Sequence, residues 1–268
     1  MPRILVVNDD GIEAQGIGVL ARALQPLGEV TVVAPDGDRS GTSHSISVQK
    51  AVRAQAMHEG DLRRFACSGT PADCVLLGVN ELCGGRPDIV VSGINRGANL
   101  ADDVNYSGTV AAAVEATITG IPAIASSLVS SWPKFDPVLH WDVAAAVTRD
   151  LAADVLRERL PHGTYWNVNV PNLAVLRGVR FTRQGRKQYA ERLAREDNET
   201  DGGAAYYWVW DMSHLGGGDD TDTVAVDAGY ASITPLQIDR TDETTLMRYQ
   251  RDPSVIPSAR AARSRDAR

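Results

Sequence analysis

The sequence predicts an α/β fold built on a doubly wound, mostly parallel sheet. Short apolar runs rich in Ile and Val recur along the first two thirds of the chain, and segments with helical spacing separate them. The runs lack the alternation of a half-exposed strand, which is typical of strands buried on both faces beneath covering helices. With 268 residues, the chain is long enough for one large domain with an appendage.

The first predicted strand, residues 3–7, runs directly into Asn8, Asp9, Asp10 and Gly11. In sheets of this kind, ligands collect outside the carboxyl ends of the strands. Because a glycine lets the backbone turn at this point, both carboxylates can converge on one hard cation. The alternative is that Asp9 or Asp10 caps the following helix, a position where Asp is frequent.

A helix and a second strand follow. Residues 16–27 place their apolar side chains at helical spacing, and Gly28 is a natural stop. Residues 30–34 form the second strand, and the loop of residues 36–43 leaves its carboxyl end. We therefore expect the loops after the first two strands to open at the same edge of the sheet.

Ser40 is the candidate ligand in this second loop. Its hydroxyl group either binds a metal or a phosphate or is that of an ordinary turn serine. We leave His44 unassigned, because a lone histidine has no metal-ligand spacing. Residues 46–66 alternate weakly and predict a hairpin or edge pair beside the sheet.

The next helix begins at Thr70. Thr70 reads as the N-cap, with proline at the first helical position and Asp73 at the third, and apolar residues continue to Leu82. We expect this helix to be scaffold.

The second informative stretch is the loop of residues 93–100, which leaves the buried strand of residues 88–92. The loop contains two glycines and two asparagines, so it can approach a ligand closely. The amide oxygens of Asn95 and Asn99 suit hard cations, and their NH2 groups suit phosphate oxygens. The alternative is a turn-forming loop without a ligand.

A helix over residues 110–116 starts soon afterwards, and its free N–H groups point toward the same rim. Helix starts of this kind bind anions, so we predict a phosphate site with the Ser107 and Thr109 hydroxyl groups beside it. Capping of the helix by Ser107 is the simpler interpretation, and both can hold together.

The remaining core elements lie before residue 184. They are a strand over residues 121–125, a helix over 141–160, and strands over 166–171 and 179–181. Residues 184–220 differ in character, because charged residues there precede the aromatic residues Tyr206, Tyr207, Trp208 and Trp210. An aromatic hairpin marks a subunit contact or packs inside its own chain. Regular structure returns at residues 221–236.

Composition excludes several classes of partner. A formal charge of −7 lacks the basic footprint needed to bind nucleic-acid backbones or anionic membranes. There is no apolar run of about 18 residues and no signal-peptide pattern, so we expect a soluble, cytoplasmic protein that does not bind membranes. The three cysteines have no C-x-x-C spacing and are expected to be plain buried thiols.

Several motifs occur together in a fixed order. They are Asn8–Gly11, Ala34–Asp36, Arg39–Gly41, Gly69–Val75, Asp88–Asn95, Tyr106–Ala111 and Gly229–Leu236. Over nearly the whole chain up to Leu236, this series resembles the survival protein SurE family of metal-dependent 5'/3'-nucleotidases. One departure is the sequence Gly-Ala-Asn-Leu-Ala at residues 97–101, where the family usually has Gly-Pro-Asn-Leu-Gly.

The resemblance implies a set of site residues. The implied metal ligands are Asp9, Asp10, Ser40 and Asn95, of which Asp9, Asp10 and Asn95 are also the implied catalytic residues. The implied phosphate-side residues are Asn99, Ser107, Gly108 and Thr109. Oxygen ligands alone suit one Mg²⁺ or Mn²⁺ ion per subunit.

The implied reaction is hydrolysis of nucleoside 5'- and 3'-monophosphates by a metal-activated water, with polyphosphate as a further candidate substrate. A covalent route through Asp9 is the less favoured alternative, because aspartyl-phosphate phosphatases use an Asp-x-Asp spacing. Two other classes stay open. A Pro-Asp-Asp deacetylase would require histidines near its acids, and a non-catalytic nucleotide-binding stress-response module could dispense with the carboxylates.

We divide the chain into four predicted segments. They are a Rossmann-like catalytic core at residues 1–183, an aromatic arm at 184–220, a return to the core with a C-terminal exchange segment at 221–257, and a polar tail at 258–268. The resembled family forms dimers and tetramers by exchanging a hairpin and C-terminal elements. We therefore expect a homodimer or homotetramer whose arm packs on the neighbouring subunit.

Overall fold

The computed structural model describes residues 1–57, 62–130, 138–189, 194–197, 205–208, 212–216 and 218–251. The chain divides into two compact units, residues 1–236 and residues 237–268. This boundary lies inside the predicted segment 221–257, and the four-part division stays a prediction. Trp210 and the predicted polar tail lie outside the described residues.

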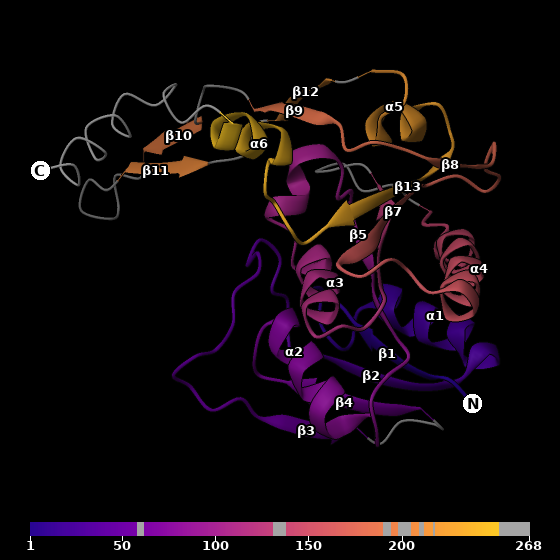
Figure 1. Cartoon of the computed structure of the whole chain (residues 1–268). Coiled ribbons are helices and arrows are strands. Elements are labelled where there is room, and N and C mark those ends of the chain that lie inside the picture. The colour runs from indigo at the N-terminus through magenta and orange to yellow at the C-terminus, as the bar shows by residue number, and fades with distance from the viewer. Residues whose placement is uncertain are drawn as a thin grey trace, which may run out of the picture. The chain divides into compact units, whose positions relative to one another are not determined.

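Within the described residues, the first unit contains a nine-stranded sheet with the strand order β3-β4-β2-β1-β5-β6-β7-β13-β8 (Figure 1). The strands are β1 Arg3–Val7, β2 Glu29–Pro35, β3 Ala54–Met57, β4 Arg63–Cys67, β5 Ile89–Arg96, β6 Ala123–Val129, β7 Thr164–Pro171, β8 Val179–Phe181 and β13 Ala231–Gln237. Neighbours from β4 to β7 pair in parallel. The edge strand β3 pairs antiparallel with β4, which confirms the predicted edge pair.

Helices cover both faces of this sheet. Helices α1 (Gln15–Leu24) and α4 (Trp141–Glu158) pack against each other on one face, and α2 (Pro71–Leu77) and α3 (Gly108–Ile118) do so on the other (Figure 1). The predicted capping box of Thr70 and Asp73 begins α2. This arrangement is the doubly wound fold that the sequence predicts.

The remaining described elements are short. They are the 3₁₀ turns Gln25–Leu27 and Ala101–Asn105, the π turn Gly78–Leu82, helices α5 Asp222–Asp227 and α6 Glu243–Arg251, and strands β9 Arg186–Tyr189, β10 Ala194–Asp197, β11 Ala205–Trp208 and β12 Met212–Gly216. Strand β10 pairs antiparallel with β11, and β12 pairs antiparallel with β9. The predicted aromatic hairpin therefore corresponds to β10 and β11.

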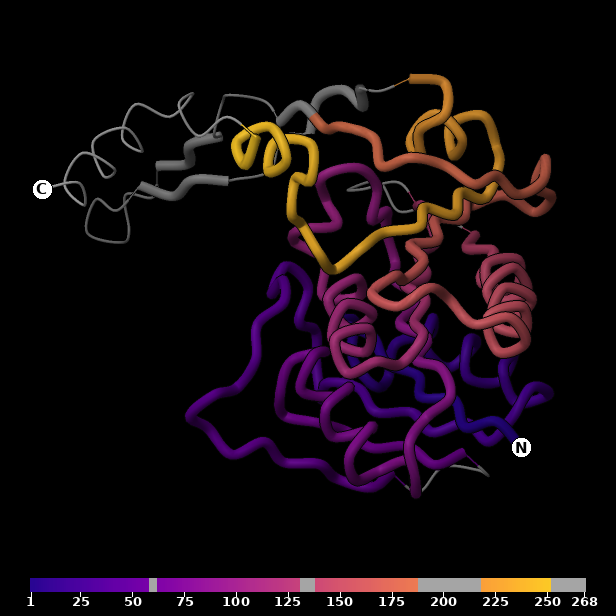
Figure 2. Tube along the Cα trace, in the orientation of Figure 1, coloured from indigo at the N-terminus to yellow at the C-terminus, as the bar shows by residue number. Residues whose placement is uncertain are grey.

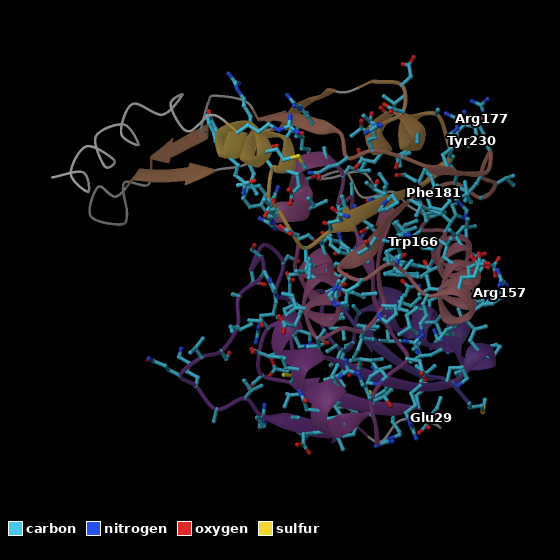
Figure 3. All side chains as sticks on the ribbon, in the orientation of Figure 1. Glu29, Arg157, Trp166, Arg177, Phe181 and Tyr230 are labelled. Atoms are coloured by element: carbon cyan, nitrogen blue, oxygen red, sulfur yellow. The ribbon has the colours of Figure 1, made fainter. Side chains whose placement is uncertain are left out.

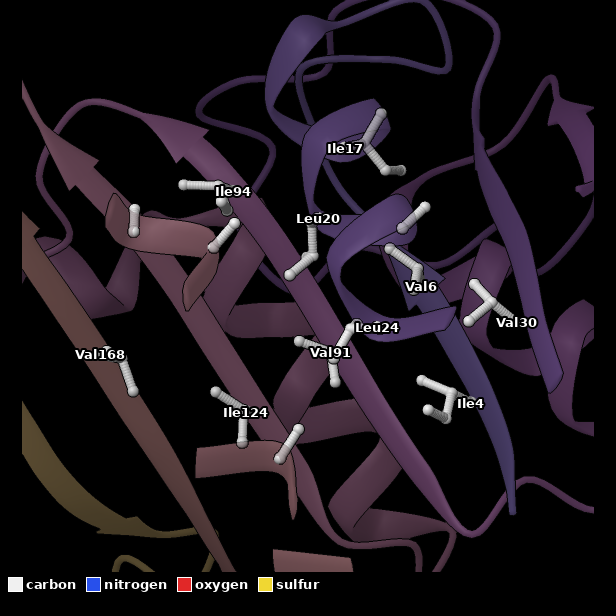
Figure 4. Close-up of a cluster of buried hydrophobic side chains, with 14 of the residues drawn as sticks. Ile4, Val6, Ile17, Leu20, Leu24, Val30, Val91, Ile94, Ile124 and Val168 are labelled. Carbon is white, nitrogen blue, oxygen red and sulfur yellow. The ribbon is translucent and has the colours of Figure 1, made fainter. Parts of the chain in front are cut away.

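Burial on both faces explains the unbroken apolar runs. In β1, Ile4 and Val6 pack with Leu20 and Leu24 of α1 (Figure 4), whereas Leu5 lies against Gly78, the residue that follows α2. All four β1 side chains from Ile4 to Val7 are fully buried. A strand in this position has no solvent-facing side, so alternation would place polar groups in the core.

Strand β5 is longer than the sequence predicts. It continues through Arg96, because Asn95 and Arg96 pair with β6 after a register shift that follows Ser92. Gly93 lies within this shift with a φ of +134°, a conformation that glycine readily adopts. Its presence suggested a loop, whereas the structure uses it as an irregularity inside a strand.

The other end of the sheet is β8, which pairs in parallel with β13. Phe181 of β8 contacts Trp166 edge-on with a ring separation of 5.7 Å (Figure 3). The guanidinium groups of Arg177 and Arg180 lie over the Tyr230 ring. Phe181 nevertheless stays 66% exposed. This edge therefore presents apolar surface.

Strands β1 and β5 flank the topological switch point of the sheet. The chain runs from β1 to β2 on one side and later returns to β5 on the other side of β1. In open sheets of this type, ligands bind outside the carboxyl ends of the strands at this point.

Two further expectations concern the cysteines and the membrane. Cys67, Cys74 and Cys83 are free and buried, as predicted. Among the described helices, none is long and apolar enough to cross a membrane.

Candidate active site

Three loops and one helix start meet at the switch point. The main-chain N–H of Arg39 donates to the main-chain oxygen of Asp9 at 2.8 Å, which joins the loops after β1 and β2. The N–H of Arg96 donates to Asp10 Oδ2 at 3.2 Å, which joins the end of β5. The Thr109 hydroxyl donates to Asp9 Oδ1 at 2.5 Å, which joins the start of α3. Segments far apart in the sequence thus converge on the two carboxylates.

Asn8 shapes the turn that carries these acids. It is fully buried, its Nδ2 donates to the main-chain oxygen of Gly11, and its Oδ1 accepts from the Gly11 N–H. Gly11 has a φ of +102°, and a Cβ there would lie 3.1 Å from the carbonyl carbon of Gly37. Glycine is required both for this conformation and for the close approach of the two loops.

The start of α3 lies directly against Asp9. A Cβ on Gly108 would lie 2.8 Å from Asp9 Oδ2, so only glycine allows this approach. The Ser107 hydroxyl oxygen accepts from the N–H of Val110 at 3.0 Å, which confirms the capping interpretation of Ser107. The N–H groups of the first turn of α3 therefore lie next to Asp9 and Asp10. We call the edge of the sheet that carries these two carboxylates the acidic rim.

Both acids resist losing their protons in the absence of a cation. Asp9 is 3% exposed, and burial raises the pKa of its carboxyl group, although the Thr109 hydroxyl opposes this effect. Burial, followed by the charge of Asp9, raises the pKa of Asp10 to about 7. A buried carboxylate beside a half-buried one is unfavourable as a pair of anions unless a positive charge compensates them. This arrangement fits a cation site.

Asp38 is a member of the rim that sequence reasoning missed. Its negative charge raises the pKa of both Asp9 and Asp10. Its Oδ1 accepts from the Ser40 N–H at 2.8 Å and from the Ser40 hydroxyl at 2.6 Å. The Asp-x-Ser spacing is the available signal, because an aspartate often accepts hydrogen bonds from the residue two positions later.

The other two proposed cation ligands are compatible with that role. The Ser40 hydroxyl donates a hydrogen bond to Asp38 Oδ1, which leaves the lone pairs of the Ser40 oxygen available to a cation. The Asn95 Nδ2 donates to the main-chain oxygen of Gly97 at 3.0 Å, so its Oδ1 is the atom that suits a cation. Within the described residues, no group of three or more His, Cys, Asp or Glu side chains is arranged to hold a metal. The candidate set is instead two carboxylates, an amide and a hydroxyl, all hard oxygen donors.

Asn99 lies in a buried amide network. Its N–H donates to Asn169 Oδ1, and its main-chain oxygen accepts from the Nδ2 atoms of Asn167 and Asn169. Its own Nδ2 donates to the Ser127 hydroxyl at 2.8 Å. Asn99 is 6% exposed, and its hydrogen bonds run to the sheet and not to Asp9. Sequence reasoning missed Asn167 and Asn169, whose alternate spacing in β7 places both on one face.

Two other features lie away from the acids. His44 belongs to the long loop between β2 and β3, which Figure 2 traces. Its Nε2 lies 2.8 Å from Oε2 of Glu115 in α3. A cavity of about 460 Å³ lies between α1 and β4, where Arg22, Leu62 and Arg64 contribute to its lining. The predicted site residues do not line this cavity.

Comparison with known proteins identifies close relatives of the chain. Residues 4–191 match the family described as Survival protein SurE. The chain is 47% identical over 242 residues to the 5'/3'-nucleotidase SurE of Cronobacter sakazakii. This match covers 89% of this chain and 91% of that protein. It is also 47% identical over 244 residues to the 5'/3'-nucleotidase SurE of Proteus mirabilis, with coverage of 90% and 92%.

The fold has a solved counterpart as well. The crystal structure of the SurE protein from Aquifex aeolicus superposes with a TM-score of 0.79 and 39% sequence identity. The match covers 94% of this chain and all of the Aquifex aeolicus chain.

Proposed function

The chain belongs to the Survival protein SurE family, and we propose that it hydrolyses nucleoside monophosphates with one divalent cation held by Asp9, Asp10, Ser40 and Asn95. The protein is a nucleotidase, as its identity to the curated 5'/3'-nucleotidases over most of its length indicates. Mg²⁺ and Mn²⁺ suit the candidate ligands best, because all four contribute oxygen atoms.

The observation that carries the proposal is the position of Asp9 between Asp10, a half-buried acid, and the start of α3. The Asp9 carboxylate accepts a hydrogen bond from the Thr109 hydroxyl and lies against Gly108. Asp10 follows Asp9 in the same turn. A cation bound by these acids would therefore lie beside a helix N-terminus that suits phosphate. This adjacency supports the proposal.

When bound, a divalent cation supplies positive charge to a phosphate oxygen and lowers the pKa of a bound water molecule. Asp9, Asp10, Asn95 and the Ser40 hydroxyl would hold the cation in this position. In the first turn of α3, the N–H groups of Val110 and Ala111 donate to Ser107, so the Gly108 N–H is the group that would hold a remaining phosphate oxygen. This contact would stabilise the charge that develops during in-line attack. Asp9 is engaged by Thr109 and enclosed by Gly108, which supports a ligand role for it over a nucleophilic role.

The other two functional classes have less support. A deacetylase of the Pro-Asp-Asp type would bring histidines to the acids, whereas His44 is hydrogen-bonded to Glu115 on α3. A non-catalytic nucleotide-binding module would have no need for two adjacent acids with raised pKa values, because desolvated carboxylates without a compensating charge destabilise the fold.

A second part of the proposal concerns assembly. The edge strand β8 exposes Val179 at 49% and Phe181 at 66%, and the aromatic residues of β11 lie in a hairpin outside the main sheet. Apolar edges of this kind are unfavourable in water and are commonly covered. We therefore infer at least a homodimer, with a tetramer as the larger alternative.

A panel of phosphomonoesters tests the reaction and its cofactor together. Nucleoside 5'- and 3'-monophosphates, sugar phosphates and polyphosphate are assayed with excess chelator, and then with Mg²⁺ or Mn²⁺ restored. We expect chelation to abolish the release of phosphate and either cation to restore it. Undiminished turnover in chelator would contradict the cation site. No turnover of any nucleotide with either cation would contradict the nucleotidase activity.

A further inference from the structure

The loop that carries Asn99 is connected to the base of the arm. We call residues 97–105 the substrate loop and residues 184–187 the arm base. Both belong to the first compact unit, and they lie side by side because β9 packs on the 3₁₀ turn of the substrate loop. The contacts between them are made by one buried carboxylate, one glutamine and one lysine.

Asp222 is the buried carboxylate. It is fully buried at the start of α5, its Oδ2 accepts from the Ala101 N–H at 2.9 Å, and its Oδ1 accepts from the Gly185 N–H at 2.8 Å. The Oδ1 also accepts from the Thr223 N–H at 2.8 Å. One side chain thus hydrogen-bonds to the substrate loop and to the arm base at once.

Ala101 has a backbone conformation that depends on such support. It is fully buried with a φ of +53°, in the left-handed region that residues other than glycine seldom adopt. Its N–H is held by Asp222, and its main-chain oxygen accepts from Gln184 Nε2 at 3.0 Å. Both polar main-chain atoms of Ala101 are therefore bound by groups outside the substrate loop.

Asn99, two residues earlier, is held from the opposite side. Asn169 of β7 binds both its N–H and its main-chain oxygen, and Asn167 binds the same oxygen at 2.8 Å. The substrate loop is therefore fixed at Asn99 by the central sheet and at Ala101 by Asp222. A shift at Ala101 would turn the short segment that carries Asn99.

The arm base adds a further connection. The Lys187 N–H donates to Asp102 Oδ2 at 2.8 Å, and the Lys187 ammonium group pairs with Asp103. The side chains of Lys187 and Asp103 are 7% and 19% exposed, so solvent screens this pair only weakly. The substrate loop thus contacts the arm base at three consecutive residues, Ala101, Asp102 and Asp103.

We propose that Asp222 is a positioning residue for the phosphate side of the active site and that it couples this side to the arm base. The proposal rests on the proposed function, which assigns the start of α3 to phosphate binding, and on the predicted phosphate-side role of Asn99. The substrate loop leads directly into this helix start, because the N–H groups of Tyr106 and Ser107 donate to the main-chain oxygen of Asp103. Asp222 itself does not touch the acidic rim in the described structure. It acts through the backbone of Ala101, so its removal should change phosphate binding and leave cation binding intact.

Two variants test the coupling. Asp222→Asn keeps the shape of the side chain but turns an NH2 group toward a main-chain N–H, and Gln184→Ala removes an exposed side chain that bonds to Ala101. For each folded variant, the inhibition constant for inorganic phosphate, the KM and kcat for a nucleoside monophosphate, and the Kd for Mn²⁺ are measured. We expect the phosphate inhibition constant and KM to rise about tenfold for Asp222→Asn and about threefold for Gln184→Ala, with the Mn²⁺ Kd unchanged.

Matched controls separate this effect from general loss of stability. Thr148→Val removes a fully buried hydroxyl that bonds to Ser126, away from the substrate loop. Gln55→Ala makes the same exposed substitution in β3, at the other end of the sheet. Neither control should change phosphate inhibition or KM.

The results that would overturn the proposal are specific. Unchanged phosphate inhibition in Gln184→Ala and in a folded Asp222→Asn would refute it, as would an equal loss of Mn²⁺ affinity. If Asp222→Asn does not fold, Gln184→Ala decides alone. If the parent protein has no nucleotidase activity, the proposed function fails, and phosphate affinity measured by calorimetry still decides the coupling.

Discussion

The Asp10 carboxyl group has a pKa of about 7, first because it is buried and second because Asp9 is charged. In the metal-free protein, the folded chain therefore binds more protons than the unfolded chain between pH 3.8, its ordinary pKa, and about pH 7. The contribution of Asp10 to the free energy of unfolding is present below its ordinary pKa and is lost as the pH rises through about 7. A cation reverses this preference, because it binds the ionised carboxylate.

The first prediction follows from this linkage. We expect saturating Mg²⁺ or Mn²⁺ to raise the melting temperature more at about pH 8 than at about pH 6, because protons compete with the cation at the lower pH. Calorimetry in buffers of different protonation enthalpy should detect proton release on cation binding at the lower pH. In Asp10→Asn, cation affinity should fall sharply, and this difference between the two pH values should shrink while the fold is kept. Equal cation-induced shifts at both pH values would contradict the prediction, and unchanged cation affinity in the variant would show that Asp10 does not bind the cation. The helix-capping alternative is wrong, because Ala14 is the N-cap of α1 and no side chain caps this helix.

Thr109 provides the second prediction. Its hydroxyl is fully buried and donates to Asp9 Oδ1 at 2.5 Å, so Thr109→Val removes a hydrogen bond to a charged group while preserving shape. We expect binding of the phosphate product to weaken by about 1–3 kcal/mol. Because the lost bond is to Asp9, cation affinity should weaken as well. Phosphate inhibition constants and the Mn²⁺ Kd measure the two effects.

The same helix contains a matched control for this substitution. Thr117 is 4% exposed, and its hydroxyl donates to the main-chain oxygen of Ala113, away from the rim. Thr117→Val should leave both binding constants unchanged. If Thr109→Val also leaves them unchanged, Thr109 has only a structural role.

Among the secondary-structure elements, α3 brings its first turn up to the acids because its first residue, Gly108, has no side chain. The approach of Gly108 to Asp9 is closer than any Cβ allows, since that atom would lie 2.8 Å from both Oδ2 and Cβ of Asp9. The Ser107 hydroxyl, which accepts from the Val110 N–H, also fixes the direction of the first turn. The position of the whole helix relative to β1 therefore depends on one glycine.

The third prediction is that Gly108→Ala separates α3 from Asp9. We expect activity to be lost and the free energy of unfolding to fall by about 1–3 kcal/mol, the usual effect of overpacking. Gly18→Ala in α1 is the control, because its Cβ would be in ordinary contact with Arg22 and alanine favours a helix by about 0.5–1 kcal/mol over glycine. Chemical denaturation and nucleotidase assays measure both. Full activity in Gly108→Ala would show that this close approach is not needed for catalysis.

For the whole molecule, the open question is how the apolar edge at β8 and the hairpin of β10 and β11 are covered. The arm base is bonded to the substrate loop and to Asp222, so removal of the entire arm would also disturb the core. A sharper variant keeps residues 184–187 and replaces residues 188–217 with a short Gly-Ser linker.

The fourth prediction is that light scattering finds the parent protein as a dimer or larger and the linker variant in a smaller assembly. The physical reason is that aromatic residues such as Tyr206, Tyr207 and Trp208 are unfavourable in water unless they are packed. A monomeric parent at micromolar concentration would refute the prediction. Retained assembly in the variant would assign the interface to another part of the chain.

The sequence by itself determined the fold class, the order of most elements and the acidic turn. Periodicity, turn chemistry and caps act over a few residues, so the strand that ends in Asp9 and Asp10 and the capping box at Thr70 are both predictable from local patterns. The ordered motifs also identified the family without any coordinates, because the motifs themselves are local.

Only the tertiary structure decided which groups touch. The Thr109 hydroxyl reaches Asp9 across 100 positions, and Asp222 reaches Ala101 across 121, because the sheet register and helix packing bring these segments together. The raised pKa of Asp10 has the same origin, since burial and the proximity of charges are properties of the folded chain. Local patterns carry no record of such long-range contacts, which explains why Asp38, Asn167 and Asn169 were missed and why the buried network of Asn99 was not foreseen.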